Sequence, residues 1–178
     1  IVVDGGSKDG TRSLIEQYSS VIKWWVSEPD RGIYDAWNKA LPHATGEWIC
    51  FLGADDLLWT SETLALVSQP LQNLRDSELL AYGQVAMQDQ DDDRVLEVLG
   101  TEWGTAKMAL AKCMPIPHPG LFCRRRLFDI VGAYDASYRV AGDYAHFLKS
   151  IAVSDPVFLN SGVVVGMRRG GVSTDLRR

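Results

Sequence analysis

An apolar run that ends in two adjacent carboxylates, within residues 46–56, constrains the fold of this chain more than any other stretch. Residues 48–52 are apolar without polar alternation, a pattern typical of a strand buried on both faces of a parallel sheet. Ligands in open α/β sheets collect at the carboxyl ends of such strands, where Asp55 and Asp56 lie. Because successive side chains point in roughly opposite directions, one carboxylate can take a hydroxyl while the other takes a metal. The alternative is that the pair caps the next helix or turns the chain.

Composition and charge narrow the class of protein and the kind of partner. The 178 residues suit one domain, and the composition, 46% hydrophobic and 23% charged, is that of a globular protein. We therefore expect a single domain over residues 1–178. The formal net charge of −5 argues against nucleic acid as a partner, because phosphate backbones are held by clustered Lys and Arg. A phosphate-bearing substrate would need a cation to enter an acidic pocket.

Cysteine use and hydropathy bear on the cellular compartment. The cysteines Cys50, Cys113 and Cys123 form no CxxC pair, so neither a zinc site nor a disulfide framework is indicated, and a reducing cytosol is the plain interpretation. No stretch approaches the roughly 18 apolar residues of a membrane-spanning helix, and no signal peptide is visible. Residues 1–3 begin as though in mid-strand, which leads us to expect that an earlier piece has been removed.

The remaining pattern alternates strands with helices, as an α/β fold requires. Residues 1–3 predict a strand, residues 5–10 a glycine turn and residues 11–18 a helix, without the GxGxxG fingerprint of dinucleotide-binding proteins. Further strands are predicted at 21–27, 79–87, 94–99, 120–123 and 157–167, and further helices at 33–44, 60–67, within 103–113, at 124–131 and from residue 143.

Two of these segments carry more specific predictions. The apolar positions of 33–44 recur at helical spacing and indicate core packing, with Tyr34 directed to another face and with Pro42 ending or kinking the helix. Residues 88–93 carry alternate aspartates but lack the glycine and the glutamate of a calcium loop, so we interpret them as a solvated hairpin tip.

Several ordered motifs carry a resemblance to a known family. They occupy residues 1–11, 27–40, 44–48 and 53–56. In order and spacing they resemble family 2 glycosyltransferases of the GT-A fold, of the kind that assemble capsule or colanic-acid polysaccharides. Residues 118–122, 142–144 and 170–173 resemble later motifs of the same family, so the resemblance covers nearly the whole chain. It implies a Rossmann-like α/β sandwich whose mainly parallel central sheet is flanked by helices, with the first βα unit missing.

The resemblance implies a nucleotide-sugar site built from side chains that are far apart in the sequence. Asp4 would accept a hydrogen bond from a ring N–H of the base, and Asp30 would lie near the base or the ribose. Asp55 would lie near the ribose or the phosphate, and His118 would line the donor or acceptor pocket. Turn formation is the alternative role for Asp4 and Asp30, and a structural role is the alternative for His118.

The resemblance assigns metal binding and proton removal to two further carboxylates. Asp56 would hold Mn²⁺ or Mg²⁺ on the diphosphate, because both ions accept hard oxygen ligands. By this resemblance Asp143 would be the catalytic base, which removes the proton of an acceptor hydroxyl in an inverting transfer. Helix capping is the alternative for Asp143, since aspartate is favoured at helix starts. Arg168 and Arg169 are candidates for adding positive charge to the diphosphate site.

The residues and the resemblance together predict a metal-dependent inverting glycosyltransferase that moves a sugar from a UDP- or GDP-sugar to an acceptor hydroxyl. The acceptor would be a saccharide or a lipid-linked saccharide in cell-surface polysaccharide assembly. The enzyme would act in the cytoplasm, with peripheral association at the inner face of the membrane as an option. A sugar-nucleotide nucleotidyltransferase is one alternative, although residues 5–8 match its triphosphate loop only weakly. A non-catalytic sugar-nucleotide binding module is the other.

Overall fold

The structure, a computed structural model, describes residues 1–170 and contains a small and a large sheet. The strands are β1 (Val2–Asp4), β2 (Trp25–Ser27), β3 (Trp48–Cys50), β4 (Leu57–Leu58), β5 (Leu80–Gln88), β6 (Val95–Leu99), β7 (Leu121–Arg124) and β8 (Val157–Arg168). The α-helices are α1 (Thr11–Gln17), α2 (Ile33–Ala40), α3 (Thr63–Gln72), α4 (Trp103–Ala106), α5 (Arg125–Val131) and α6 (Gly142–Ile151). The 3₁₀ helices are η1 (Leu41–His43), η2 (Lys107–Ala109) and η3 (His118–Gly120). The predicted α/β class is confirmed.

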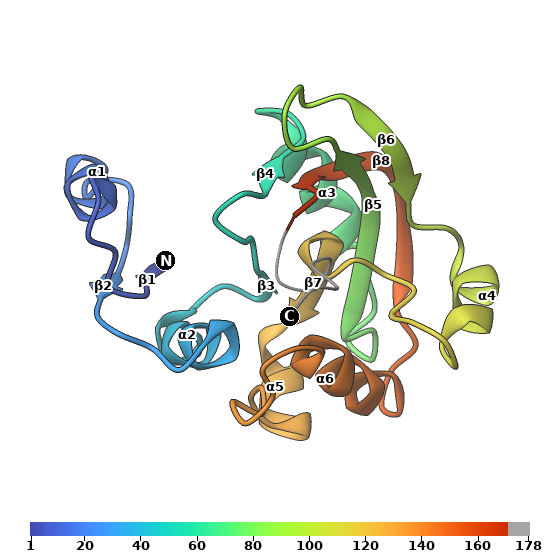
Figure 1. The fold of residues 1–178 in the computed structure, drawn as a ribbon. Coiled ribbons are helices and arrows are strands. Elements are labelled where there is room, and N and C mark those ends of the chain that lie inside the picture. The colour runs from blue at the N-terminus through green and yellow to red at the C-terminus, as the bar shows by residue number, and fades with distance from the viewer. Residues whose placement is uncertain (171–178) are drawn as a thin grey trace.

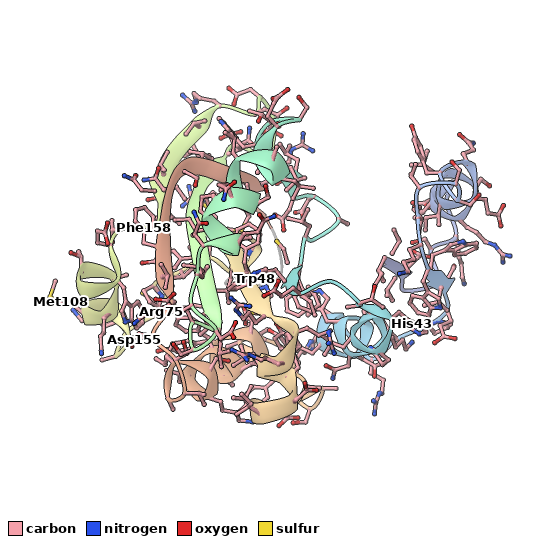
Figure 2. The ribbon with its side chains drawn as sticks, turned by 180° about the vertical axis from the view of Figure 1, so that it is seen from behind. His43, Trp48, Arg75, Met108, Asp155 and Phe158 are labelled. Atoms are coloured by element: carbon pink, nitrogen blue, oxygen red, sulfur yellow. The ribbon has the colours of Figure 1, made fainter. Side chains whose placement is uncertain are left out.

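The small sheet pairs β1 with β2 in parallel, and α1 makes the crossover between them. The helix α2 follows and gives way to η1 around Pro42, as predicted. Trp24 stacks on His43 with ring centroids 3.7 Å apart, and Lys23 Nζ donates to Thr45 Oγ1 at 3.0 Å. These contacts tie the small sheet to the segment after α2. Figure 1 shows the small sheet on one side of α2 and the large sheet on the other, and Figure 2 labels His43 between α2 and the small sheet.

The large sheet has the strand order β3-β7-β5-β8-β4, with β6 added to β5. Within the described residues, β5 and β8 form its one parallel pair, and the other pairs are antiparallel. The central sheet predicted as mainly parallel is therefore mixed. Strand direction follows the connections, because the turn between β5 and β6 is short and reverses the chain, whereas the crossover from β5 to β8 contains α5 and α6. The predicted hairpin with its tip at 88–93 is confirmed.

The strand β3 differs from the strand predicted at 48–52. It ends at Cys50, pairs antiparallel with β7 at the end of the strand order, and leaves Leu52 40% exposed. One face of Trp48 is covered by the guanidinium of Arg124, which lies 4.6 Å from the ring centroid. An apolar run alone therefore did not distinguish an edge strand from a central one. The central strand is β5, most of which is buried.

The core lies on both faces of β5, whose side chains alternate between two clusters. On one face Val67 of α3 packs in the cluster that contains Val85. On the other face Leu127 of α5 and Phe147 of α6 pack in the cluster that contains Tyr82. A third cluster is largely aromatic and joins α2 to β3. None of the helices between residues 1 and 170 is long and apolar enough to cross a membrane.

Candidate active site

Asp4 and Asp30 lie at the same end of the small sheet, where β1 and β2 finish side by side. The Asp4 carboxylate accepts hydrogen bonds from the Ser7 N–H at 3.0 Å and from the hydroxyls of Ser7 and Ser27. The Ser27 hydroxyl, and after it the Ser7 hydroxyl, lower the pKa of Asp4 below its ordinary value, so this carboxylate is ionised at neutral pH. The Asp30 carboxylate lies over Gly5, where a Cβ would meet its oxygen at 2.7 Å. Both carboxylates therefore gather at the glycine turn after β1.

An open groove of about 620 Å³ lies between the small sheet and β3. Val3 and Asp30 line it on the side of the small sheet, and Trp37 lines it from α2. Gly53 and Ala54, the two residues before the acid pair, line it after β3. Residues of β1 and of β3 also line it. The groove therefore reaches both the Asp30 turn and the turn that carries the acid pair.

Asp55 and Asp56, which we call the acid pair, follow β3 through a turn. The Gly53 N–H donates to Asp56 Oδ2 at 2.8 Å. A Cβ on Gly53 would lie 3.0 Å from Asp56 Oδ2 and 3.2 Å from Asp55 Oδ1, so oxygens of both carboxylates converge over this glycine. Burial raises the pKa of Asp56, and the charge of Asp55 raises it further. The helix α3 begins only at Thr63, so the pair shapes a turn and does not cap that helix.

The acid pair fits a divalent cation that is shared with a substrate. Mg²⁺ in nucleotide-using sites commonly takes one or two carboxylates and completes its shell with water and substrate phosphates, and Mn²⁺ accepts the same ligands. Two converging carboxylates would supply the protein's share of such a shell. Between residues 1 and 170, no group of three or more His, Cys, Asp or Glu side chains could hold a metal ion. Binding at the acid pair would therefore depend on ligands from the substrate.

Asp143 lies in the first turn of α6, and a residue of α2 holds its carboxylate. The Tyr34 hydroxyl donates to Asp143 Oδ1 at 2.9 Å and accepts the Gly142 N–H at 2.9 Å. The residue before the helix, Ala141, has a left-handed backbone with φ 64°, a conformation that costs free energy outside glycine and gathers at functional sites. The N-terminus of α6 has no side-chain cap. Asp143 is therefore engaged by Tyr34 at a strained helix start.

His118 is buried beside the same aromatic cluster. Its ring stacks on Trp37 with centroids 4.4 Å apart, and its Nε2 shares a 2.9 Å hydrogen bond with the Tyr134 hydroxyl. Its Nδ1 is buried and has no hydrogen-bond partner within the described part of the chain. Because Trp37 lines the groove, His118 supports the wall of the groove through this stack.

Burial of His118 makes stability depend on pH. Burial lowers the pKa of His118 to about 4 and also lowers the pKa of His146. An unfolded histidine has a pKa of about 6.5, so between these values the unfolded chain binds protons that the folded chain does not, and stability falls as pH falls. We expect His118 alone to remove roughly 3 kcal/mol from the free energy of unfolding between pH 7 and pH 4. Urea unfolding across this range measures the slope.

The variant for this measurement is His118→Asn. It should flatten the dependence on pH, because it removes a buried ring that takes up its proton on unfolding. An equal slope in wild type and His118→Asn would contradict the assignment.

The structure gathers the predicted site residues in three places. These are the turn after β1 with Asp4 and Asp30, the acid pair Asp55 and Asp56, and the aromatic cluster with Asp143 and His118. Among residues 1–170, no hydrogen bond or ion pair joins one of these places to another. Arg168, predicted to add charge at the diphosphate, pairs with Asp93 at 2.8 Å on the β5–β6 hairpin. Residues 171–173 of the last predicted motif lie outside the described residues.

Three aromatic residues at the site were not predicted as functional. Tyr34 holds Asp143, Trp37 lines the groove, and Tyr134 bonds to His118. The apolar stripe of 33–44 predicted core packing alone. The available signal was the placement of a tyrosine hydroxyl off that stripe, within a segment that resembles a family motif.

Relatives of this chain are glycosyltransferases. The profile described as glycosyl transferase family 2 matches residues 1–119. A PGL/p-HBAD biosynthesis glycosyltransferase of Mycobacterium bovis (strain BCG / Pasteur 1173P2) is 34% identical over 150 residues, 81% of this chain and 54% of that protein. An uncharacterized glycosyltransferase of Mycobacterium tuberculosis (strain ATCC 25618 / H37Rv) is 29% identical over 187 residues, 100% of this chain and 70% of that protein. The chain therefore spans about half the length of the first of these relatives.

Two solved structures share the fold. S. aureus TarS 1-349 in complex with UDP-GlcNAc has a TM-score of 0.71 and 16% identity, over 97% of this chain and 50% of that chain. The mannosyltransferase PcManGT from Pyrobaculum calidifontis, in complex with GDP-Man and Mn²⁺, has a TM-score of 0.64 and 21% identity, over 97% of this chain and 48% of that chain. The fold is therefore that of GT-A glycosyltransferases, as predicted. The chain belongs to glycosyl transferase family 2.

Proposed function

We propose that this chain carries the catalytic site of an inverting glycosyltransferase, which moves a sugar from a nucleoside-diphosphate sugar to an acceptor hydroxyl. The observation that carries the proposal is the presence of two separate carboxylate sites. The acid pair converges beside the groove, and Asp143 is held at a helix start by Tyr34. The first site suits a diphosphate with its cation, and the second suits proton removal. Membership of glycosyl transferase family 2 supports the same reaction class.

Asp143 is the general base in this proposal. The acceptor oxygen attacks the anomeric carbon, and the bond from that carbon to the phosphate oxygen breaks with its electron pair leaving on the nucleoside diphosphate. The acceptor proton passes to Oδ2 of Asp143, because Oδ1 already accepts the Tyr34 hydroxyl. One displacement of this kind inverts the configuration at the anomeric carbon.

Asp56, with Asp55 beside it, is the proposed site for Mn²⁺ or Mg²⁺. When bound, the cation would neutralise charge that develops on the departing diphosphate. Asp56 is held by the Gly53 N–H, and the more exposed Asp55 would lie near the ribose or the phosphate. The complex of PcManGT with GDP-Man and Mn²⁺ supports a divalent ion within this fold.

Asp4, Asp30 and His118 complete the proposed nucleotide-sugar site. Three hydrogen bonds from Ser7 and Ser27 occupy acceptor positions of Asp4, and a carboxylate offers about four. The Gly6 N–H also interacts with this carboxylate, so a ring N–H of the base would share or displace one of these donors. Asp30 would lie near the base or the ribose from the adjoining turn. His118 would act on the pocket by holding Trp37 in place.

The setting of the reaction follows from its relatives and is also a proposal. The Mycobacterium bovis relative takes part, by its name, in PGL/p-HBAD biosynthesis. By analogy we place this chain in cell-surface glycan assembly, with a saccharide or a lipid-linked saccharide as acceptor. It would act at the cytoplasmic face of the membrane on a UDP- or GDP-sugar.

The donor and the cation are tested by thermal shift. With UDP-GlcNAc or GDP-mannose at about 100 times its dissociation constant and with Mn²⁺, binding adds about 2.7 kcal/mol. For a chain of this size, that stabilisation raises Tm by roughly 5–10 °C. Asp56→Asn should lose the part of the shift that depends on Mn²⁺. The matched control is Asp91→Asn on the exposed hairpin tip, which should behave as the wild type.

Two other results would point away from glycosyl transfer. A full shift in Asp56→Asn with Mn²⁺ would remove this residue from the cation site. Release of pyrophosphate from a nucleoside triphosphate would favour a nucleotidyltransferase.

A further inference from the structure

Tyr34 is buried where the first turns of two helices meet. Its side chain belongs to α2, and its hydroxyl lies 2.9 Å from both Asp143 Oδ1 and the Gly142 nitrogen at the start of α6. The residue is 5% exposed. The hydroxyl therefore bridges the backbone and the carboxylate of two consecutive residues in α6.

The ring of Tyr34 is fixed independently of its hydroxyl. A Cβ on Gly142 would lie 2.7 to 2.9 Å from carbons of this ring, so the glycine lets the ring pack directly on the backbone of α6. The ring also meets Trp37 edge-on at 5.5 Å and stacks on Tyr134 at 6.0 Å. These contacts leave the ring little freedom to turn, so the hydroxyl stays in one position.

The donor and acceptor roles of the Tyr34 hydroxyl also favour a single arrangement of Tyr34 and Asp143. Burial raises the pKa of Tyr34, so the phenol stays protonated and its one proton is directed to Asp143. Its oxygen accepts the Gly142 N–H. Among the described residues, Asp143 Oδ2 accepts no hydrogen bond, so the two oxygens of this carboxylate are not equivalent.

We propose that Tyr34 is a positioning residue for Asp143, which holds Oδ1 and directs Oδ2 to the acceptor hydroxyl. This proposal rests on the proposed function of Asp143 as the general base. A carboxylate at a helix start can otherwise rotate among several side-chain conformers. Tyr34 selects one of them before the acceptor arrives, and such pre-organisation lowers the barrier of the chemical step without strengthening donor binding.

Removing only the hydroxyl of Tyr34 distinguishes this positioning role from a purely structural role. Tyr34→Phe keeps the ring that packs on Gly142 and loses the bridge to Asp143. We expect kcat for release of UDP from UDP-GlcNAc, or of GDP from GDP-mannose, to fall about 10- to 100-fold with Mn²⁺ and water as acceptor. The donor KM should change by less than about twofold, because the loss is confined to the transition state.

The matched control is Tyr82→Phe. Tyr82 is fully buried and donates its hydroxyl to the Thr101 carbonyl, away from the site. Tyr82→Phe should lose about as much stability as Tyr34→Phe, while its kcat stays within about twofold of the wild type. In an Asp143→Asn background, Tyr34→Phe should have no further effect on kcat, because residues that act as a unit are not additive.

The proposal is overturned by a wild-type kcat in Tyr34→Phe, by a loss seen mainly in donor KM, or by an equal loss in the Asp143→Asn background.

Failure of the proposed function looks different, since the wild type would then release no nucleoside diphosphate or Asp143→Asn would be fully active. In that case NMR decides the positioning of Asp143. A hydroxyl proton signal that is absent in Tyr34→Phe and shifted in Asp143→Asn supports it, and a signal unmoved by Asp143→Asn overturns it.

Discussion

Asp143→Asn is expected to lower the rate of sugar transfer by about 10²- to 10⁴-fold, the range that a general base contributes. Asparagine keeps the shape of the side chain and still accepts the Tyr34 hydroxyl through its carbonyl oxygen. It cannot take the acceptor proton at neutral pH. Donor affinity should stay within about twofold, because Asp143 acts on the acceptor and not on the nucleotide. Release of UDP or GDP and calorimetric titration with the donor measure the two quantities.

The control for this variant is Asp129→Asn, which removes an exposed carboxylate from the neighbouring helix α5. It should be as active as the wild type. Undiminished turnover in Asp143→Asn would remove Asp143 from the role of base. Tight nucleotide binding without turnover in the wild type would favour a non-catalytic binding module.

Arg124→Leu is expected to lower the free energy of unfolding by about 3 kcal/mol. Arg124 is 5% exposed, and its guanidinium donates to the carbonyls of Glu78 at 2.9 Å and Leu74 at 3.1 Å. It also pairs with Glu47 and covers the ring of Trp48, its partner across β3 and β7. Leucine fills part of the volume but leaves these carbonyls without their donors. Figure 2 labels Trp48, whose ring would lose this cover.

Urea unfolding measures the loss, with Arg126→Leu as the matched control on the exposed side of α5. The control should change the free energy of unfolding by less than about 0.5 kcal/mol. Arg124→Lys keeps the charge but lacks the planar fork of donors, so it should fall between wild type and Arg124→Leu. A loss in Arg124→Leu no larger than in Arg126→Leu would contradict this account of the β3 edge.

The elements that the sequence predicted well are those set by local pattern. The helices α1 and α5 and the β5–β6 hairpin follow from periodicity and turn residues, and Pro42 marks the end of α2 because its ring removes a helical hydrogen bond. The acid pair was expected directly after a strand, but β3 ends at Cys50, so residues 51–54 intervene and β4 begins directly after the pair. Local pattern did not predict that β3 lies at an edge, because an apolar strand can be covered by a second layer or by one long side chain such as Arg124.

The sequence by itself determined the α/β class, the GT-A resemblance and the candidate carboxylates, because ordered motifs and short-range periodicity can be recognised without a structure. Only the tertiary structure decided the direction of the strands in the large sheet, since direction depends on which strands pair after the crossovers pack. It also decided which group engages Asp143. Tyr34 lies 109 residues earlier in the chain, and their hydrogen bond exists because α2 and α6 begin at the same place in space.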